Sequence, residues 1–321
     1  MSRILIIKLG ALGDVIMATP IIKQIQHHHD RDELSLLTSP PFINLFKNWK
    51  GLNVAAFPRQ GLLSIPRSVS WIRQQKFDVL YDIQSNDRTS IISALSGIRK
   101  RVGNHPRFPY HIHPPEPYVG QCHAFERLNQ ILLGANITPA PQTPWLPKDK
   151  QGESFVKSWL KEKGLFNEQL VLLHAGSSKK HPDKRWPHFG ELAEILEKYS
   201  YQVLWIGGND DLEINCKLAT QAGFDASKIF DVLQLIELGK LASFAVTNDS
   251  APMHILSCSM IPVYGLFGPT NWRRAHALGQ QHRVITPAAN IISQDNVFTP
   301  RPLDTLSIDK VLEKLKDDGL I

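Results

Sequence analysis

Apolar positions alternate along the chain between short continuous runs and helical patterns. Residues 3–8 contain a continuous apolar run that is followed by a glycine, which is typical of a strand buried on both faces of a parallel sheet. Apolar side chains then recur at helical spacing at Val15, Ala18, Ile22 and Ile25. Because a strand, a glycine loop and a helix follow in this order, the opening indicates the first unit of a nucleotide-binding type of fold.

The same alternation continues to the end of the chain. Further strands are predicted at 34–37, 54–57, 78–83, 170–174, 202–206, 245–247 and 262–265. Helices are predicted at 153–163, 189–199 and 308–315. Strands that alternate with helices predict α/β units with doubly wound parallel sheets.

A proline-rich segment divides this pattern in two. Prolines at 139, 141, 144 and 147 stiffen and extend residues 136–148, where we expect an interdomain linker. A chain of 321 residues fits two domains of roughly 150 residues each. We expect domains at 1–148 and 149–305, and a C-terminal helix at about 306–321 that is a candidate to pack back on the first domain.

Composition and charge narrow the function classes. Apolar residues make up 42% and charged residues 21%, as in an ordinary globular protein. With neither a signal-peptide pattern nor an apolar run near the roughly 20 residues that span a bilayer, we expect a cytoplasmic protein. The net charge of +6 favours an anionic substrate or peripheral contact with the anionic inner face of a membrane over nucleic acid, for which no binding signature is present.

Asp14 is the first candidate for chemistry. It follows a loop with Gly10 and Gly13, too few glycines for a dinucleotide-binding GxGxxG motif. One interpretation is a helix cap, whose carboxylate accepts amide hydrogen bonds. The other is a general base at the carboxyl end of the first strand, where α/β folds bind ligands. The local sequence leaves both open.

Residues 246–254 are the most informative segment of the second half. They predict a strand end, a polar turn with Asp249 and Ser250, and a helix with Pro252 in its first turn, a combination that suits anion binding. We expect Lys184, after the Gly176 loop, to reach phosphate oxygens. An ordinary capped helix and a solvated charged loop are the alternatives.

Two further loops follow strands in the second half. The acids after Gly207 and Gly208, including Asp211 and Glu213, can accept hydrogen bonds from ribose hydroxyls or simply form an acidic first helical turn. Gly268 belongs to a second glycine loop after the strand at 262–265.

Metal ligands are weakly indicated. The three cysteines lie far apart, and the Asp30-Arg31-Asp32 triplet beside three histidines is better interpreted as a solvated loop than as a metal-nucleotide motif. Basic residues accumulate in the first half and suit an anionic ligand, although many will be plain surface: Arg59, Arg67, Arg88, Arg99, Lys100, Arg101 and Arg107, with His105, His111 and His113 among them.

In this order and spacing, the segments resemble glycosyltransferase family 9, the heptosyltransferase family. The resemblance rests on K-x-G-x-x-G-D at 8–14, D-S-[AG]-x-x-H at 249–254 and F-G-P-T at 267–270, and it covers nearly the whole chain. It implies a GT-B fold, in which two Rossmann-like domains face a central cleft. Gly176-Ser177-Ser178 stands where some members carry a threonine pair, and Pro252 removes one amide from the turn.

The resemblance also implies a reaction. The chain would be an inverting, metal-independent enzyme without cofactors that transfers heptose from ADP-heptose to an anionic lipid A acceptor bearing Kdo sugars. Asp14 would be the catalytic base, Lys184 would contact phosphate, and 249–254 would bind the sugar nucleotide. The expected donor-binding residues are Gly176, Ser177, Lys184, Asp211, Glu213, Asp249, Ser250, Ala251, His254 and Gly268. The expected acceptor-binding residues are Gly13, Arg59, Arg88 and Arg101.

Three other interpretations remain. A glycosyltransferase could use another nucleotide sugar for a different surface glycan. A non-catalytic relative could bind sugar nucleotides or glycolipids, although the joint presence of Asp14, Lys184 and His254 argues against it. A nucleotide-dependent oxidoreductase or epimerase would need a Tyr-x-x-x-Lys pair, which the sequence lacks.

Overall fold

The computed structural model describes residues 1–321 except 62, 105–107, 116–121, 179 and 288–297. The described chain divides into two compact units, Met1–Pro147 (unit 1) and Lys148–Ile321 (unit 2). This division falls one residue before the boundary expected from the proline-rich segment.

Unit 1 is built on a five-stranded sheet in the order β3-β2-β1-β4-β5, with all neighbouring pairs parallel. The strands are β1 Arg3–Ile7, β2 Glu33–Thr38, β3 Leu52–Ala56, β4 Val79–Asp82 and β5 Lys100–Val102. The sequence pattern missed β5, because it has three residues and two of them are basic.

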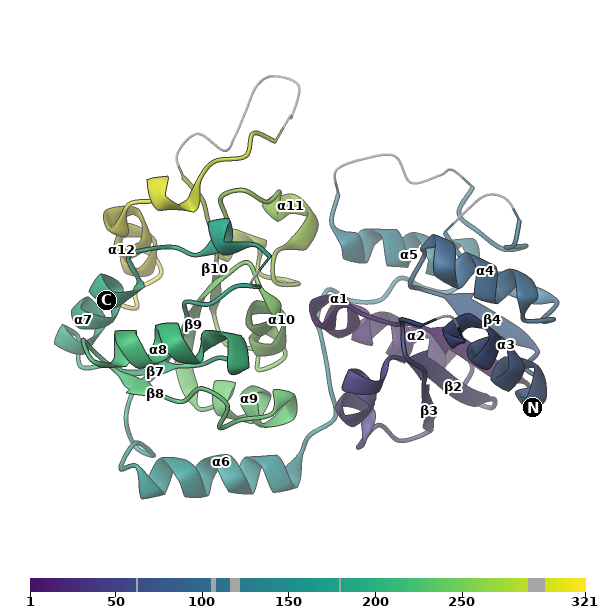
Figure 1. Ribbon diagram of the computed structural model, residues 1–321, viewed down its shortest axis with the longest axis horizontal. Helices are drawn as coiled ribbons and strands as arrows, with labels where there is room; N and C mark the ends of the chain where they lie inside the picture. The colour runs from purple at the N-terminus through teal and green to yellow at the C-terminus, as the bar shows by residue number, and fades with distance from the viewer. Residues whose placement is uncertain (62, 105–107, 116–121, 179, 288–297) are drawn as a thin grey trace. The chain divides into compact units, whose positions relative to one another are not determined.

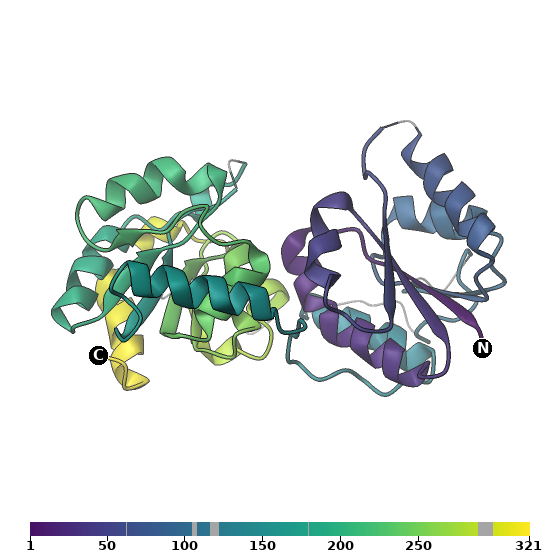
Figure 2. The same ribbon diagram turned by 90° about the horizontal axis from the view of Figure 1, so that it is seen from below.

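Helices cover both faces of this sheet (Figures 1 and 2). They are α1 Leu12–Met17, α2 Thr19–His28, α3 Ser64–Gln75, α4 Asp87–Leu95 and α5 Ala124–Gly134, and a 3₁₀ helix, η1 Pro40–Phe46, follows β2. On one face, Val69 and Ile72 of α3 and Ile92 of α4 pack with Leu5 and Ile7 of β1 in a buried core. On the other face, α2 contacts α5.

The proline-rich segment packs along unit 1. The backbone amide of Trp145 donates to Thr19 Oγ1 at 3.0 Å, and its ring meets Trp49 edge-on at 4.9 Å. The Asn129 side chain donates to the carbonyl of Ala140 and accepts from its amide. The prolines therefore stiffen a segment that is held on the surface of unit 1 by its own apolar and aromatic side chains.

Unit 2 has a six-stranded parallel sheet in the order β11-β10-β9-β6-β7-β8. The strands are β6 Leu170–His174, β7 Gln202–Trp205, β8 Phe224–Asp225, β9 Ala242–Asn248, β10 Val263–Leu266 and β11 Val284–Ile285. Counted from β6, this is the 3-2-1-4-5-6 order of the dinucleotide-binding fold, and unit 1 has the same order without the sixth strand. The two-residue strands β8 and β11 were too short for the sequence pattern to reveal.

The helices of unit 2 are α6 Lys150–Glu162, α7 Phe189–Lys198, α8 Leu212–Ala219, α9 Val232–Gly239, α10 Ala251–Ser257, α11 Trp272–Ala275 and α12 Ile308–Asp317. Four 3₁₀ helices accompany them: η2 Pro182–Lys184, η3 Asn209–Asp211, η4 Gln281–Arg283 and η5 Leu303–Thr305. Within the described part of the chain, no helix has both the length and the apolar character that crossing a bilayer requires.

The C-terminal helix α12, which we expected as a candidate to pack back on the first domain, packs in the core of unit 2. Val311 and Leu315 are fully buried in the same core as Phe189 of α7. The Tyr201 hydroxyl donates to the carbonyl of Leu320 at 2.6 Å. The apolar face of α12 therefore packs in the core of unit 2, the unit to which the helix itself belongs.

This placement predicts a local effect of Leu315→Ala. Removing a fully buried leucine side chain should lower the free energy of unfolding by about 2–5 kcal/mol. In native-state hydrogen exchange, amides of β10 should lose protection while those of β1 keep theirs. Lys316→Ala, at an exposed neighbouring position, is the control. Lost protection in β1 would instead indicate packing on unit 1.

Candidate functional site

The carboxyl ends of β6 and β9 hold most of the expected donor-binding residues. Asn248, the last residue of β9, is fully buried and joins the two strand ends. Its Nδ2 donates to the carbonyls of Ala175 and Gly176 at 2.9 and 3.1 Å, and its Oδ1 accepts from the amide of Trp186 at 3.2 Å. The loops after the two central strands are therefore held together by one amide side chain.

Lys184 and Asp249 meet at this edge although 65 residues separate them in sequence. The Lys184 ammonium donates to Asp249 Oδ2 at 2.7 Å, and the Thr270 hydroxyl donates to the same oxygen at 2.6 Å. Both charged side chains are mostly buried, with exposed fractions of 18% and 10%. The structure thus brings three separately predicted segments to one point.

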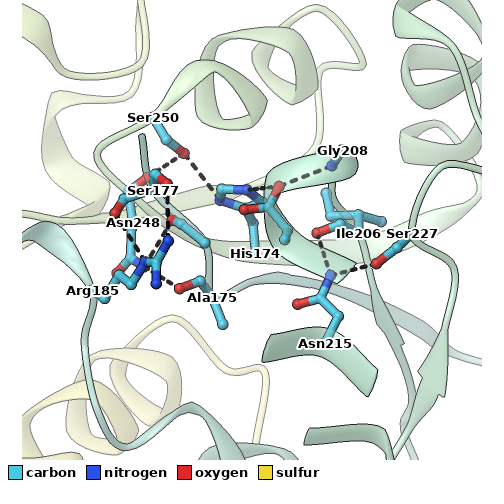
Figure 3. Close-up of polar contacts among 12 residues, drawn as sticks. His174, Ala175, Ser177, Arg185, Ile206, Gly208, Asn215, Ser227, Asn248 and Ser250 are labelled. Carbon is cyan, nitrogen blue, oxygen red and sulfur yellow. Dashed lines mark hydrogen bonds and ion pairs between the residues drawn. The ribbon is translucent and has the colours of Figure 1, made fainter. Parts of the chain in front are cut away.

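His174, the last residue of β6, lies between two further expected residues. Its Nδ1 is 3.0 Å from Ser250 Oγ, and the two side chains face each other in Figure 3. Its Nε2 is 3.4 Å from Asp211 Oδ2. Asp211 also accepts from the amide of Gly208 at 2.8 Å. From the sequence, His174 was predicted only as a strand residue. The signal that could have identified it is a polar side chain that ends an apolar run at the carboxyl edge of a sheet.

The Asp211 carboxylate is turned into the protein and is ionised. Burial by itself would raise the pKa of Asp211, but hydrogen bonds from His174 and the Gly208 amide, with the charge of Arg185, outweigh it and leave the pKa below its ordinary value. Glu213 in the next turn is exposed. Of these two acids, Glu213 is the one that faces solvent.

The Gly176 loop is shaped by the same carboxylate. A Cβ on Gly176 would lie 1.8 Å from Asp211 Oδ1, so the close approach requires glycine. Beyond it, Arg185 donates from Nε to Ser177 Oγ at 3.2 Å and from Nη2 to the Ser177 carbonyl at 3.3 Å (Figure 3). Ser177 is thus engaged in fixing the loop.

The other expected residues of unit 2 have different surroundings. Ala251 is half-buried at the start of α10, whereas His254 is buried inside that helix. Gly268 packs against the backbone of 301–303, where a Cβ would lie 2.7 Å from the Arg301 carbonyl. Gly268 therefore allows two chain segments to approach closely.

In unit 1, Asp14 lies in the first turn of α1. Its Oδ2 accepts from the amide of Ala11 at 3.2 Å, so the expected cap contact is present and uses one of the two carboxylate oxygens. Asp14 and Gly13 are half-buried. The Gln84 side chain holds the preceding loop by accepting from the amides of Leu9 and Gly10 at 3.0 and 3.2 Å.

Asp14 also lines a cavity of about 120 Å³ at the carboxyl ends of β1 and β4. Polar and charged side chains around it include Lys8, Gln84, Ser85, Asn104 and Arg127. Burial lowers the pKa of Lys8, although the charges of Asp14 and Asp82 oppose this. Arg127 comes from α5, an ordinary amphipathic helix, and no local signal in the sequence indicated its role here.

The expected acceptor arginines divide by environment. Arg59 is exposed, and its Nη1 lies 3.0 Å from where a Cβ on Gly10 would stand. Arg88 donates to Ser64 Oγ at 2.6 Å. Arg101 is buried, and its guanidinium donates to the carbonyls of Pro109 and Ile98 at 2.6 and 2.7 Å. These bonds hold the backbone of unit 1 together. His105 and Arg107 lie outside the described residues.

The Asp30–Asp32 triplet is tied into unit 1 by local contacts. Asp32 accepts from the amide of Ser2 at 2.6 Å and lies 2.9 Å from His29 Nδ1. Within the described ranges, no group of three or more His, Cys, Asp or Glu side chains is arranged to hold a metal ion.

The chain is similar to proteins of one family in its sequence and in its fold. The model of glycosyltransferase family 9 (heptosyltransferase) matches residues 67–296. A lipopolysaccharide core heptosyltransferase of Haemophilus influenzae is 23% identical over 288 residues, covering 83% of this chain and 79% of the relative. The fold is similar to that of a family 9 glycosyltransferase from Veillonella parvula, with a TM-score of 0.84, 19% identity, and coverage of 98% and 96%.

A heptosyltransferase from Escherichia coli, solved with ADP-2-deoxy-2-fluoro heptose, is similar with a TM-score of 0.70. It is 17% identical to this chain, and the similarity covers 98% of this chain and 99% of that protein. These likenesses extend over both units and agree with two doubly wound domains of the GT-B type.

The contact between Gly176 and Asp211 predicts a sharp difference between two glycine substitutions. Gly176→Ala should lower the free energy of unfolding by about 1–3 kcal/mol, because its methyl group displaces Asp211 from His174 and Gly208. Gly208→Ala meets no atom within 4 Å and should change it by less than about 0.5 kcal/mol. Urea unfolding measures both, and equal midpoints would contradict the predicted clash.

Proposed function

The chain belongs to glycosyltransferase family 9, the heptosyltransferase family, and we propose that it transfers heptose from ADP-heptose to the inner core of lipopolysaccharide. The acceptor is a Kdo or heptose residue of a Kdo-lipid A molecule. The named activity of the Haemophilus influenzae relative and the ADP-sugar bound by the Escherichia coli protein support this donor and acceptor. A different nucleotide sugar for another surface glycan is the alternative.

The observation that carries the proposal is the meeting of Lys184 and Asp249 beside the Gly176 loop. This edge of unit 2 is where doubly wound sheets bind nucleotides. A charge-assisted hydrogen bond from Lys184 to the diphosphate contributes roughly 1.5–3 kcal/mol and stabilises the charge of the departing ADP. Lys184 leaves Asp249, or is shared with it, when the diphosphate binds.

Asp14 is proposed as the general base of a single inverting displacement. Its carboxylate takes the proton of the acceptor hydroxyl as that oxygen bonds to the anomeric carbon and the bond from that carbon to the diphosphate breaks. The cap contact uses Oδ2, so Oδ1 can serve as the base. We propose that neither a metal nor a cofactor takes part, because Lys184 and nearby hydrogen-bond donors supply the charge that departure needs.

Lys8 and Arg127 support an anionic acceptor. Both line the cavity that Asp14 borders, and Arg59 stands beside the same Gly10 loop. Arginine binds carboxylates and phosphates in bidentate fashion, which suits the acidic Kdo sugar and the phosphates of lipid A. Arg59 and Arg127 are therefore the proposed acceptor contacts of unit 1.

Two substitutions of Asp14 distinguish its proposed role as the base from its contact as a helix cap. Asp14→Asn keeps an oxygen that can accept from the Ala11 amide, whereas Asp14→Ala removes both functions. With EDTA present, transfer from ADP-heptose to Kdo-lipid A should fall at least about 100-fold in both variants, while only Asp14→Ala loses thermal stability. Asp30→Asn, in the triplet of unit 1, should leave transfer unchanged.

Near-normal transfer by Asp14→Asn would show that Asp14 acts only as a helix cap and not as the base. Native protein that is silent with ADP-heptose but active with another sugar nucleotide would favour the alternative donor. Dependence of the native reaction on added metal would contradict the proposed departure of ADP.

An exposed face of α3 and α4 suits peripheral contact with the cytoplasmic face of the inner membrane. Arg88 joins the starts of the two helices through Ser64, and Arg73 donates to the Leu95 carbonyl at 2.9 Å, so the helices lie side by side and in the same direction. Ile91 and Leu95, one helical turn apart, are each 47% exposed, and Leu63 before α3 is 58% exposed.

Exposed basic side chains belong to the same two helices and to the residues that follow them. Arg67, Arg73, Arg99 and Lys100 are exposed on these helices or just after α4. Each such charge near an anionic bilayer contributes about 1 kcal/mol to binding. We therefore propose that this face rests on anionic lipid, where a glycolipid acceptor is embedded.

Vesicle co-sedimentation tests this face. The protein should bind phosphatidylglycerol-containing vesicles and not pure phosphatidylcholine vesicles. The double variant Arg67→Glu/Arg99→Glu should bind at least about 10-fold more weakly, while Lys198→Glu/Lys217→Glu, at exposed positions of unit 2, should bind as the native protein does. Equal loss in both double variants would indicate attraction by net charge alone.

A further inference from the structure

One buried imidazole determines how a hydroxyl in the proposed donor site can bond to a ligand. His174 is 3% exposed and lies between Ser250 and Asp211. Ser250 itself is half-buried, like the neighbouring Asp249, so the protein covers this residue only in part. Ser250 Oγ also lies 3.2 Å from the carbonyl of Asn248.

The proton positions in the hydrogen-bonded series Asp211–His174–Ser250 follow from the two residues at its ends. Asp211 is an ionised carboxylate and can only accept, so His174 Nε2 must carry a proton. If Nδ1 is unprotonated, the Ser250 hydroxyl donates its only proton to Nδ1. If Nδ1 is also protonated, it donates to Ser250 Oγ, and that hydroxyl directs its proton to the Asn248 carbonyl.

Both assignments have the same consequence for a ligand. The single proton of Ser250 is used within the protein in either protonation state of His174, and at least one lone pair of Oγ remains. Ser250 can therefore accept a hydrogen bond from a ligand without giving up a bond inside the protein, whereas donating its proton to a ligand would break one. A phosphate oxygen lacking a proton needs a donor, whereas a sugar hydroxyl can supply a proton.

We propose that Ser250 accepts a hydrogen bond from a hydroxyl group of the nucleotide sugar, and that His174 is the positioning residue that gives Ser250 this polarity. The inference rests on the proposed use of this edge as the donor site. In this arrangement Lys184 donates to the diphosphate, whereas Ser250 and the adjacent Asp249 accept hydrogen bonds from hydroxyl groups of the ligand. The hydroxyl can belong to the ribose or to the transferred sugar.

Three ligands separate these sources by calorimetry. ADP-heptose carries hydroxyls on both sugars, ADP carries them on the ribose alone, and 2′,3′-dideoxyadenosine diphosphate keeps the diphosphate without any sugar hydroxyl. Binding of ADP-heptose by the native protein tests the proposed function first. If the native protein binds uridine or guanosine nucleotides instead, the matching set of that base replaces the adenosine set, and binding of no nucleotide would remove both proposals.

Ser250→Ala should weaken ADP-heptose binding by about 3- to 10-fold, the effect of one neutral hydrogen bond, and leave the dideoxy ligand unchanged. A matching loss for ADP assigns the contact to the ribose, and unchanged ADP binding assigns it to the transferred sugar. Equal loss for all three ligands, or for none, would overturn the proposal. Ser250→Thr keeps the hydroxyl and should retain the native pattern.

A double-mutant cycle tests the part of His174. If His174 acts through Ser250, then Ser250→Ala should weaken ADP-heptose binding less in a His174→Ala background than in the native chain. Fully additive effects, with both variants folded by circular dichroism, would show that His174 acts independently and would overturn its positioning role.

Discussion

In each unit the chain leaves a central parallel strand in one direction and returns on its other side, and both proposed sites depend on this reversal. The chain runs from β1 outward through β2 and back to β4, and from β6 outward through β7 and eventually back to β9. Because such crossovers are right-handed, the loops after the paired central strands turn to opposite faces of the sheet and leave a crevice at its carboxyl edge. Lys8 follows β1 directly, and His174 is the last residue of β6, so each lies at the carboxyl end of the first strand of its sheet.

In unit 2, this crevice is lined by loops whose polar groups bond to one another. Asn248 satisfies two carbonyls and one amide that would be costly to bury unpaired, and Asp211 accepts from the Gly208 amide. These bonds fix the loops before any ligand arrives, so a bound ligand need not supply the free energy to order them. Glycine at 176 is the steric condition for this arrangement, because it admits the Asp211 carboxylate.

Each site also holds a lysine that interacts electrostatically with carboxylates. Lys184 is paired directly with Asp249, whereas Lys8 is buried and is influenced by the charges of Asp14 and Asp82. A buried cation without a partner would be costly, so the carboxylates stabilise these side chains in the unliganded protein. An anionic ligand must then compete for the cation, which favours ligands that make further contacts over simple anions.

The α/β class and the family were predictable from the sequence, because buried parallel strands and glycine loops follow local rules of spacing. Family membership is confirmed by comparison, whereas the roles of Asp14 and Lys184 stay predictions. Three features became visible only in the folded chain: α12 packs in the core of unit 2, the Arg101 guanidinium donates to backbone carbonyls, and His174 joins Ser250 and Asp211. These facts depend on contacts between residues far apart in the chain, and such contacts leave no periodic trace in the sequence around either partner.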